Sequence, residues 1–512
     1  MVSPTLSISP RTEAEQIGHL TRELQRAELM IQVLQERLRL YLIGKYGPKS
    51  EKLNDEQLTL LELEPGVSAA EVEAESLRDP LRPASPATSK NRTRGKHPGR
   101  QEFPSAMPRV EKVICCTPEQ RVCKSCGKES AVIGYEQSEQ LDVEPVRYFV
   151  LVTRREKRAC KSCAEGVSAA PLPARIIDKG LVSDRIVIDT IVSKYCDHLP
   201  LYRQSAMLER DTGISISRAT MDGWVMSAGG LLIPVAAAIG KELIGGSYIQ
   251  ADETPVPVQM HDNRGKNHQA YLWQYSSPEG SVLYDFRMGR GREGPKEFLD
   301  GFTGILQTDG YAACESVGGA GMVHAGCWAH ARRKVFDAVK LSPGDLVARR
   351  LVERIDDLFA MDAEARDAGM DHAQRNVLRQ ERSRPLIEII RTEMQAAQLA
   401  ALPSGALGKA AAYALTLWHK LTRFPEHPEI ELSTNVAENS MRPIALGRKN
   451  WIHVGSASAG PKVAAILSVV ESCRRLGLPV RDYFASVLPG LGNLPVQRVA
   501  RCTPAAWAAS RT

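Results

Sequence analysis

The sequence predicts an α+β multidomain protein in which an N-terminal coiled coil and a cysteine module precede a helical region and an α/β core with an all-helical insertion. Three observations lead to this fold class: a heptad repeat near the start of the chain, two Cys-x-x-Cys pairs, and a run of strand patterns that begins near residue 246. The chain has 512 residues, 43% of them apolar, which is enough for several cores of ordinary size. A net charge of +6 indicates a polyanionic partner only where basic residues cluster.

Changes in composition and periodicity divide the chain into eight segments. We predict a coiled-coil and N-terminal helical segment (12–62), a flexible basic linker (63–109), a cysteine module (110–170), a helical region (175–243), a first part of the core (244–342), a helical insertion (343–430), a second part of the core (431–490) and a tail (491–512). The core is therefore expected to combine two stretches of chain that the insertion separates.

The first segment carries a heptad pattern of apolar residues. Spacings of three and four alternate through Ile17, Leu20, Leu24, Ala27, Ile31, Leu34, Leu38 and Tyr41. This pattern is typical of a left-handed coiled coil, which would make the protein a homodimer or a higher oligomer. An amphipathic helix packed on its own domain would show the same pattern.

The linker is rich in proline, which interrupts helices. It also contains a basic run without an acidic residue between Asp79 and Glu102. The basic residues are Lys90, Arg92, Arg94, Lys96 and Arg100. Such a run either contacts DNA phosphates without sequence preference or forms a solvated arm.

The sharpest local signal is a matched pair of Cys-x-x-Cys motifs. The four cysteines are Cys123, Cys126, Cys160 and Cys163. Two such knuckles complete a tetrahedral Zn²⁺ site, and the segment between them can form strands that bring the second knuckle back to the first. A redox motif would need one pair and not two. We therefore predict a zinc ribbon.

The region 175–243 contains a helix-turn-helix pattern. A first helix is expected to end near Asp211, Gly213 supplies the turn, and a second helix from Ser217 to Val225 is capped by Ser217. Helix-turn-helix units place the second helix in the major groove of DNA, so Arg218 is a candidate DNA contact. An ordinary helical hairpin has the same pattern.

From residue 246 the pattern changes to strands. SYIQADET is a short strand that ends in acids, QAYLWQYS and SVLYDFRM form a hairpin across SPEG, PKEFLDGF is a short helix, and GILQTDG is a further strand. Three antiparallel strands followed by a helix and another strand are the order of the ribonuclease-H-like fold. Residues 343–412 show charged helical patterns without a strand, which predicts the all-helical insertion.

Two aspartates lie at the expected ends of neighbouring strands. Asp252 ends the first strand and Asp309 follows the last one, so their carboxylates can face each other. Two carboxylates within a few ångströms repel and need a cation between them. An aspartate after a strand is also a common turn or cap residue. Glu253 points to the opposite side of the strand and ranks second at its position.

Several longer strings carry a family resemblance. YGPKSEKL, PLYRQSAMLERDTGISISRATMDGWV, ADETPVPV, TDGYAAC, GCWAHARRKVFDA and AENSMRPIALGRKNWIHVGS resemble, in order and spacing, the transposases of the insertion-sequence-66 family. The resemblance runs from the heptad segment to about Leu488.

The resemblance implies a DDE transposase with a ribonuclease-H-like core. Its three carboxylates would be Asp252, Asp309 and Glu438, which would hold two Mg²⁺ or Mn²⁺ ions for strand cleavage and strand transfer. The long gap before Glu438 agrees with the helical insertion. The implied partners are double-stranded DNA, as terminal inverted repeats and as target, and companion proteins of the same element.

Basic residues surround two of these motifs. The candidate DNA contacts are Arg442, Arg448 and Lys449 after the glutamate, and Arg332, Arg333 and Lys334 after the second aspartate. Trp451 either stacks on a base or belongs to a core. Cys327 and His330 resemble a Cys-x-x-His pair found in several DDE groups, and they are either zinc or catalytic residues or a packed Cys and a helix His.

Two further functions fit parts of the chain. A catalytically inactive zinc-ribbon regulator would need none of the three acids, and a cellular nuclease would need no dimerisation segment. The N-terminus lacks the layout of a secretory signal, and the apolar run 229–240 is too short to span a bilayer. Eleven cysteines, four of them in matched pairs, indicate a reducing compartment. We expect a cytoplasmic, nucleoid-associated protein that does not bind membranes.

Overall fold

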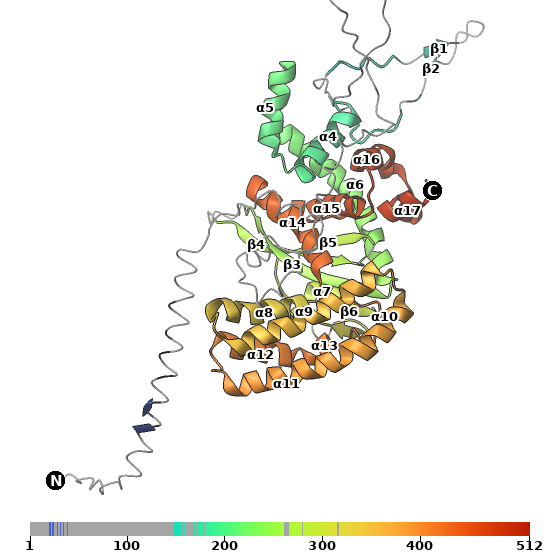
Figure 1. Ribbon diagram of the computed structural model, residues 1–512. Helices are drawn as coiled ribbons and strands as arrows, with labels where there is room; N and C mark the ends of the chain where they lie inside the picture. The colour runs from blue at the N-terminus through green and yellow to red at the C-terminus, as the bar shows by residue number, and fades with distance from the viewer. Residues whose placement is uncertain are drawn as a thin grey trace, which may run out of the picture. The chain divides into compact units, whose positions relative to one another are not determined.

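The computed structural model describes residues 148–154, 157–159, 167–169, 171, 173–178, 180–260, 266–278, 280–314 and 317–511, with eight positions between 20 and 38 (Figure 1). The chain divides into two compact units, Met1–Leu81 with Leu151–Thr512, and Arg82–Val150. The predicted zinc ligands Cys123, Cys126, Cys160 and Cys163 lie outside the described residues. Strands β1 (Lys157–Ala159) and β2 (Val167–Ala169) pair antiparallel on either side of the second knuckle in the sequence.

The heptad segment is helical at each of its eight described positions. Five of these carry apolar heptad side chains, and each is more than half exposed: Leu20, Leu24, Ile31, Leu34 and Leu38. An exposed apolar seam is what a coiled-coil helix presents to a partner. The coiled coil itself stays a prediction.

A mixed five-stranded sheet forms the centre of the larger unit, in the order β5-β4-β3-β6-β7. Its strands are β3 (Tyr248–Val258), β4 (His268–Ser276), β5 (Val282–Arg287), β6 (Ile305–Gln307) and β7 (Val323–Ala325). The first three are antiparallel, and β6 and β7 run parallel to β3. The predicted hairpin is confirmed, and the short helix expected at 295–302 is α7 (Glu293–Phe298), which begins and ends earlier. Strand β7 was not predicted.

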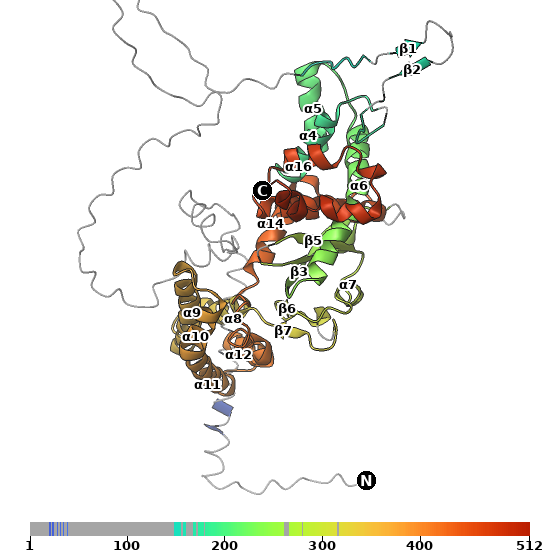
Figure 2. The same cartoon turned by 90° about the vertical axis from the view of Figure 1, so that its right-hand side faces the viewer.

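Helices cover both faces of this sheet (Figure 2). On one face, Gly240 of α6 (Arg218–Ile244) packs against Leu283 of β5 and Phe298. On the other, Tyr284 of β5 donates its hydroxyl to the carbonyl of Ser440 in α14 (Asn435–Trp451). Helix α15 (Gly460–Arg475) lies along β5 and α6. The acids carried by β3 therefore lie between two helical layers.

The helical region consists of α4 (Asp184–Tyr195), α5 (Leu201–Thr212) and α6. Two predicted details are confirmed: Gly213 ends α5 with a φ of 71°, and the Ser217 hydroxyl accepts from the Thr220 N–H at the start of α6. The predicted end at Val225 is wrong, because α6 continues to Ile244. The extra turns are buried against the core at Leu232, Val235 and Ile239.

Among the described residues, α6 alone is long and apolar enough to cross a membrane. This criterion rests on length and composition, and a core helix meets it as well. Half of the most apolar part of α6 is buried inside the structure. We therefore interpret α6 as a core helix.

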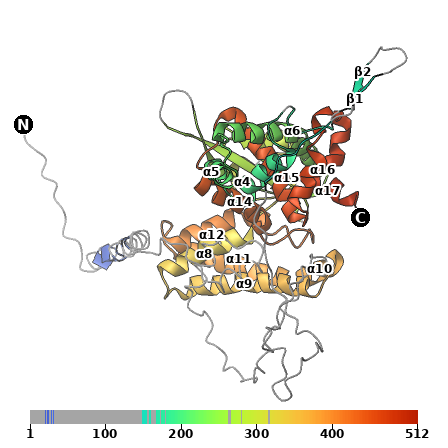
Figure 3. The ribbon, with the colours of Figure 1, turned by 90° about the horizontal axis from the view of Figure 1, so that it is seen from above.

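The described residues of the predicted insertion form helices and turns without a strand, and they share a hydrophobic core with α8 and with Tyr248, Ile305 and Ala325 of the sheet. Its helices are α9 (Leu346–Asp367), α10 (His372–Leu378), the π-helical turn η3 (Arg379–Ser383), α11 (Arg384–Ala400), α12 (Ala406–Thr416) and α13 (Trp418–Leu421). They pack with α8 (Trp328–Leu341), which follows β7, and Figure 3 shows α8 to α12 as one helical group. The insertion thus stands between β7 and α14 in the sequence.

The last residues are ordered, although we predicted a tail. They follow α16 (Val480–Val487) and form η5 (Leu491–Asn493), η6 (Val496–Cys502) and α17 (Pro504–Ala509). Trp507 is buried against the ring of Tyr483, and the Thr503 hydroxyl donates to Glu242 of α6. These contacts attach the C-terminal residues to the core.

Candidate catalytic site

Asp252 lies in the middle of β3 and not at its end, which corrects the prediction. It pairs with Gln274 of β4, which pairs in turn with Tyr284 of β5, so these three side chains share one face of the sheet. Because Tyr284 contacts α14, Asp252 faces the helix that carries Glu438. Strand β6 pairs with β3 only as far as Gln250, so Asp252 lies just beyond the end of β6.

Asp309 follows β6 by two residues, in a tight turn. Its carboxylate accepts from the Tyr311 N–H (2.8 Å), and its backbone carbonyl accepts from the Tyr413 hydroxyl of α12 (2.6 Å). Gly310 has a φ of 95°, which residues with side chains rarely adopt. The TDGY string therefore encodes a turn that needs glycine and that the insertion holds in place.

Glu438 lies in the first turn of α14 and faces α8. His330 Nε2 lies 3.6 Å from its Oε1, and Arg333 Nη2 lies 3.5 Å from its Oε2. His330 and Arg333 are three residues apart and so share one face of α8. The structure thus brings together three residues from the two motifs on either side of the insertion.

The three carboxylates lie close enough to influence one another. The pKa of Asp252 is raised from 3.8 to about 7, mainly by burial and also by the negative charges of Glu438, Glu253 and Asp309. Among the described residues, no group of three or more His, Cys, Asp or Glu side chains is arranged to hold a metal ion. The acids therefore form a cluster of like charges and not a finished set of ligands.

Glu253 lies on the opposite face and meets an arginine that we did not predict. Arg290 Nε donates to Glu253 (2.9 Å), and its guanidinium lies 4.1 Å from the centre of the Tyr311 ring. Tyr311 also donates its N–H to Asp309. Arg290 stands in a Gly-Arg-Gly-Arg loop without other chemical motifs, so only the fold shows that it lies near the acids.

The predicted DNA contacts on α8 differ in their surroundings. Arg332 pairs with Asp356 of α9, Arg333 contacts Glu438, and Lys334 Nζ lies 5.4 Å from the centre of the Tyr413 ring. The Arg332 guanidinium therefore connects α8 to the insertion. Its predicted role in DNA binding, like that of its two neighbours, stays a prediction.

The other predicted contacts lie on α14 and α6. Arg448 donates to the Pro255 carbonyl of β3, and burial lowers its pKa. Arg442 is half-buried, whereas Lys449 and Arg218 are exposed. The role of these four residues in DNA binding stays a prediction.

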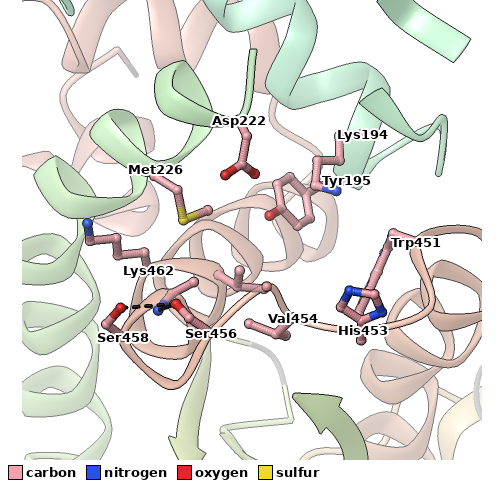
Figure 4. A pocket seen from close by; sticks show the side chains of 13 residues that line it. Lys194, Tyr195, Asp222, Met226, Trp451, His453, Val454, Ser456, Ser458 and Lys462 are labelled. Atoms are coloured by element: carbon pink, nitrogen blue, oxygen red, sulfur yellow. Dashed lines mark hydrogen bonds between the residues drawn. The ribbon is translucent and has the colours of Figure 1, made fainter. Parts of the chain in front are cut away.

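Trp451 lines a pocket of about 330 Å³ between α4, α6 and the loop after α14 (Figure 4). Lys194 Nζ lies 6.0 Å from the centre of the indole ring, and the Tyr195 hydroxyl is buried without a hydrogen bond to any described residue. Trp451 is half-buried and packs against the core. Stacking of Trp451 on a base stays a prediction.

Cys327 and His330 do not lie in a cluster of metal ligands among the described residues. Cys327 is buried, which raises its pKa, and its sulfur accepts from the Thr434 N–H (3.3 Å) at the start of α14. His330 instead faces Glu438. In this structure the pair therefore supports α14 and its glutamate.

Most of the chain matches known protein families. Residues 179–462 match the family described as "Transposase IS66 family", residues 120–164 match the "zinc-finger binding domain of transposase IS66", and residues 33–111 match the "Transposase C of IS166 homeodomain". Two uncharacterized proteins of Sinorhizobium fredii are similar to it. Protein y4qI is 34% identical over 468 residues, which cover 87% of this chain and 83% of the relative. Protein y4jD is 30% identical over 446 residues, which cover 83% and 86%.

The mixed sheet with its cluster of acids and these matches define the class of protein: the chain is a transposase of an insertion sequence. More than half of its length matches a single family model. The chain belongs to the IS66 transposase family, as its motifs predicted.

Proposed function

We propose that this transposase is a DDE enzyme that cleaves DNA strands at the terminal inverted repeats of its element and transfers them to target DNA. The observation that carries the proposal is that Asp252 lies close enough to Glu438 and to Asp309 for their negative charges to raise its pKa. These residues come from three separate segments, and each lies in one of the motifs that resemble the family. A protein that only binds DNA gains nothing from gathering like charges in a half-buried cluster.

The sheet supports a ribonuclease-H-like core. Three antiparallel strands are followed by two parallel strands on the far side of β3, in the order β5-β4-β3-β6-β7. One acid lies on the central strand, one follows the neighbouring parallel strand, and one comes from a helix that covers the sheet. The insertion enters after β7 and α8, so the third acid comes late in the chain.

The donor chemistry fits divalent metal ions. Mg²⁺ and Mn²⁺ prefer carboxylate oxygens, and a half-buried cluster of carboxylates is stabilised by a cation. Asp252, Asp309 and Glu438 would hold the metal, which when bound activates an attacking oxygen and stabilises a leaving oxygen. Of the surrounding residues, Arg333 flanks Glu438 and Arg290 lies near the Asp309 turn. Their positive charges would attract the phosphate of the strand to be cut.

The other modules supply partners for this reaction. Cys123, Cys126, Cys160 and Cys163 all lie within the segment that matches the zinc-finger domain, which supports Zn²⁺ as their ligand. The exposed heptad seam supports a homodimer or a higher oligomer. Basic residues on α8, α14 and α6 would bind DNA phosphates, and companion proteins and a cytoplasmic, nucleoid-associated location agree with this function.

Cleavage of the element's own terminal repeats tests the proposal. With Mg²⁺ or Mn²⁺ the wild type should cut such a DNA, and Asp309→Asn should cut it at least about a thousandfold more slowly, because members of a catalytic unit act together. Asp300→Asn is the matched control, since Asp300 is an exposed aspartate on the same unit. A wild type that binds the repeats but cuts them no better than Asp309→Asn would instead be a regulator.

A further inference from the structure

A short segment, residues 430–434, connects the insertion to α14, and we call it the strap. Each of its residues has its backbone held by another element. The Ile430 carbonyl accepts from Arg379 (2.9 Å), the Leu432 carbonyl accepts from the Trp328 N–H (2.8 Å), and the Thr434 N–H donates to Cys327. Thr434 in turn accepts from the Glu438 N–H (3.0 Å) in the first turn of α14. The position of the strap therefore determines where α14 begins and where Glu438 lies.

Two glutamines and a tyrosine of the sheet hold the rest of the strap. Gln307 Nε2 donates to the Glu431 carbonyl (2.7 Å), and Gln250 Nε2 donates to the Ser433 carbonyl (3.1 Å). The Tyr248 hydroxyl accepts from the Glu431 N–H (3.2 Å) and donates to Gln307. Gln250 also donates to Gln307 (2.9 Å), so the three side chains form one network.

This network is fully buried and leaves Gln307 without unused hydrogen-bonding capacity. Its oxygen accepts from Tyr248 and Gln250, and its amide group donates to Glu431 and to the Gly326 carbonyl (3.0 Å). Neither glutamine is exposed to solvent. The Gln307 amide, with every partner in place, fixes geometry, because any displacement leaves polar groups unpaired.

The two glutamines stand at matching places before the two aspartates. Gln250 precedes Asp252 by two residues and Gln307 precedes Asp309 by two residues, and the glutamines are paired neighbours on β3 and β6. On β3, Gln250 and Asp252 share one face of the sheet. The strands that carry the aspartates thus also hold the strap that leads to the glutamate.

The insertion holds the strap from the other side. Arg375 Nη1 donates to the Glu431 carboxylate (2.8 Å), and both Arg375 and Arg379 pair with the buried Asp362 (2.7 Å each). Glu431 is therefore the residue at which the insertion and the sheet network meet.

We propose that Tyr248, Gln250 and Gln307 are positioning residues that fix Glu438 relative to Asp252 and Asp309, and that Glu431 connects this arrangement to the helical insertion. The inference rests on the proposed function for its chemical meaning. Its structural part, that these side chains fix the strap and the first turn of α14, stands without it.

Tyr248→Phe tests the inference with the loss of one oxygen atom. The first readout is hydrogen–deuterium exchange of full-length protein without DNA. The amides of residues 431–438 should exchange at least about tenfold faster than in the wild type, because local opening costs less when a buried hydrogen bond is lost. Exchange in β4 and β5 should stay unchanged. Gln307→Leu should produce a larger effect at the same residues.

The second readout separates chemistry from binding. At saturating DNA, Tyr248→Phe should cleave about tenfold to a hundredfold more slowly, since a displacement of roughly 1 Å costs on the order of a hundredfold. The dissociation constant for DNA should not change. Binding of Mn²⁺ alone, measured by calorimetry, should weaken towards that of Glu438→Gln. Arg375→Gln should change the same quantities in the same direction.

Ser472→Ala is the matched control. The Ser472 hydroxyl also joins a late helix to the sheet through two buried bonds, from the Val282 N–H (2.9 Å) and to the Val282 carbonyl (3.1 Å). Its loss should destabilise the protein without faster exchange at residues 431–438. Equal effects of Ser472→Ala and Tyr248→Phe on exchange and cleavage would overturn the inference. A wild type that never cuts DNA, combined with the expected exchange result, would refute only the proposed function.

Discussion

Asp252→Asn should stabilise the metal-free transposase while it abolishes cleavage. Asp252 is half-buried near three other acids, and its pKa rises from 3.8 to about 7. Each pH unit between these two pKa values corresponds to about 1.4 kcal/mol in the free energy of unfolding. The substitution can therefore stabilise the protein by at most about 4 kcal/mol at pH 8. Solvent relaxation around a partly accessible cluster reduces this, so we expect a gain of about 1–3 kcal/mol in the free energy of unfolding.

The sign of the pH dependence follows from proton binding. Below pH 3.8 the carboxyl is protonated in the folded and in the unfolded chain. The aspartate therefore does not lower the free energy of unfolding relative to asparagine. Between 3.8 and about 7 the unfolded chain releases its proton and the folded chain keeps it, so the wild type loses stability as the pH rises. The advantage of Asp252→Asn should therefore be small at pH 4 and complete by pH 8.

Urea unfolding followed by tryptophan fluorescence measures this advantage. All six tryptophans lie between residues 224 and 507, so the signal reports on the unit that carries the site. Asp300→Asn, at an exposed position, should show no comparable gain. Mn²⁺ should stabilise the wild type more than it stabilises the Asp252→Asn variant. A variant that is less stable than the wild type at pH 8, or a gain that does not depend on pH, would refute the reasoning.

Three further predictions concern the other modules. Asp362→Ala should lower the free energy of unfolding by about 3–5 kcal/mol in urea titrations, because Arg379 would remain buried without its counter-ion and Arg375 would keep only Glu431; a loss below about 1 kcal/mol would contradict this. Cys126→Ser should remove about one equivalent of zinc per chain by elemental analysis, and unchanged zinc would rule out the predicted site. Leu24→Lys should lower the mass measured by light scattering, since it places a charge in the exposed heptad seam, and an unchanged mass would exclude the coiled coil as the dimer contact.

Local patterns predicted the elements whose signals lie within a few residues. Alternating apolar residues around a turn predicted the hairpin of β4 and β5. The cap at Ser217 predicted the start of α6. The insertion followed from a long stretch without a strand pattern. In each case the residues that determine the element are close together in the sequence.

Elements that depend on distant contacts were missed or misplaced. The first strand was expected to end in its acids, but β3 continues through Pro255 and Pro257, which pair with β4 and lie beyond the pairing with β6. Helix α6 continues past its predicted end because Gly229 lets it pack closely against Lys462 of α15. Such tertiary contacts leave no periodic signal.

The candidate site was predicted unevenly for the same reason. Asp252 and Asp309 were predicted as site residues because each was expected at the end of a strand. Asp252 in fact lies in the middle of its strand. Nothing local distinguished Glu438 among the 60 acidic residues, and only the family resemblance indicated it. Gln250 and Gln307 were missed, because a buried glutamine is recognised only once the strap that it holds has been located.

Glu438 is therefore the residue whose role most directly tests the central claim. We would measure single-turnover cleavage of terminal-repeat DNA with Mn²⁺ for the wild type, Glu438→Gln and Glu388→Gln, which changes an exposed glutamate on α11. The account predicts normal cleavage by Glu388→Gln and a loss of at least about a thousandfold for Glu438→Gln with unchanged DNA affinity. Cleavage by Glu438→Gln at the wild-type rate would contradict the assignment of the three carboxylates to one catalytic site.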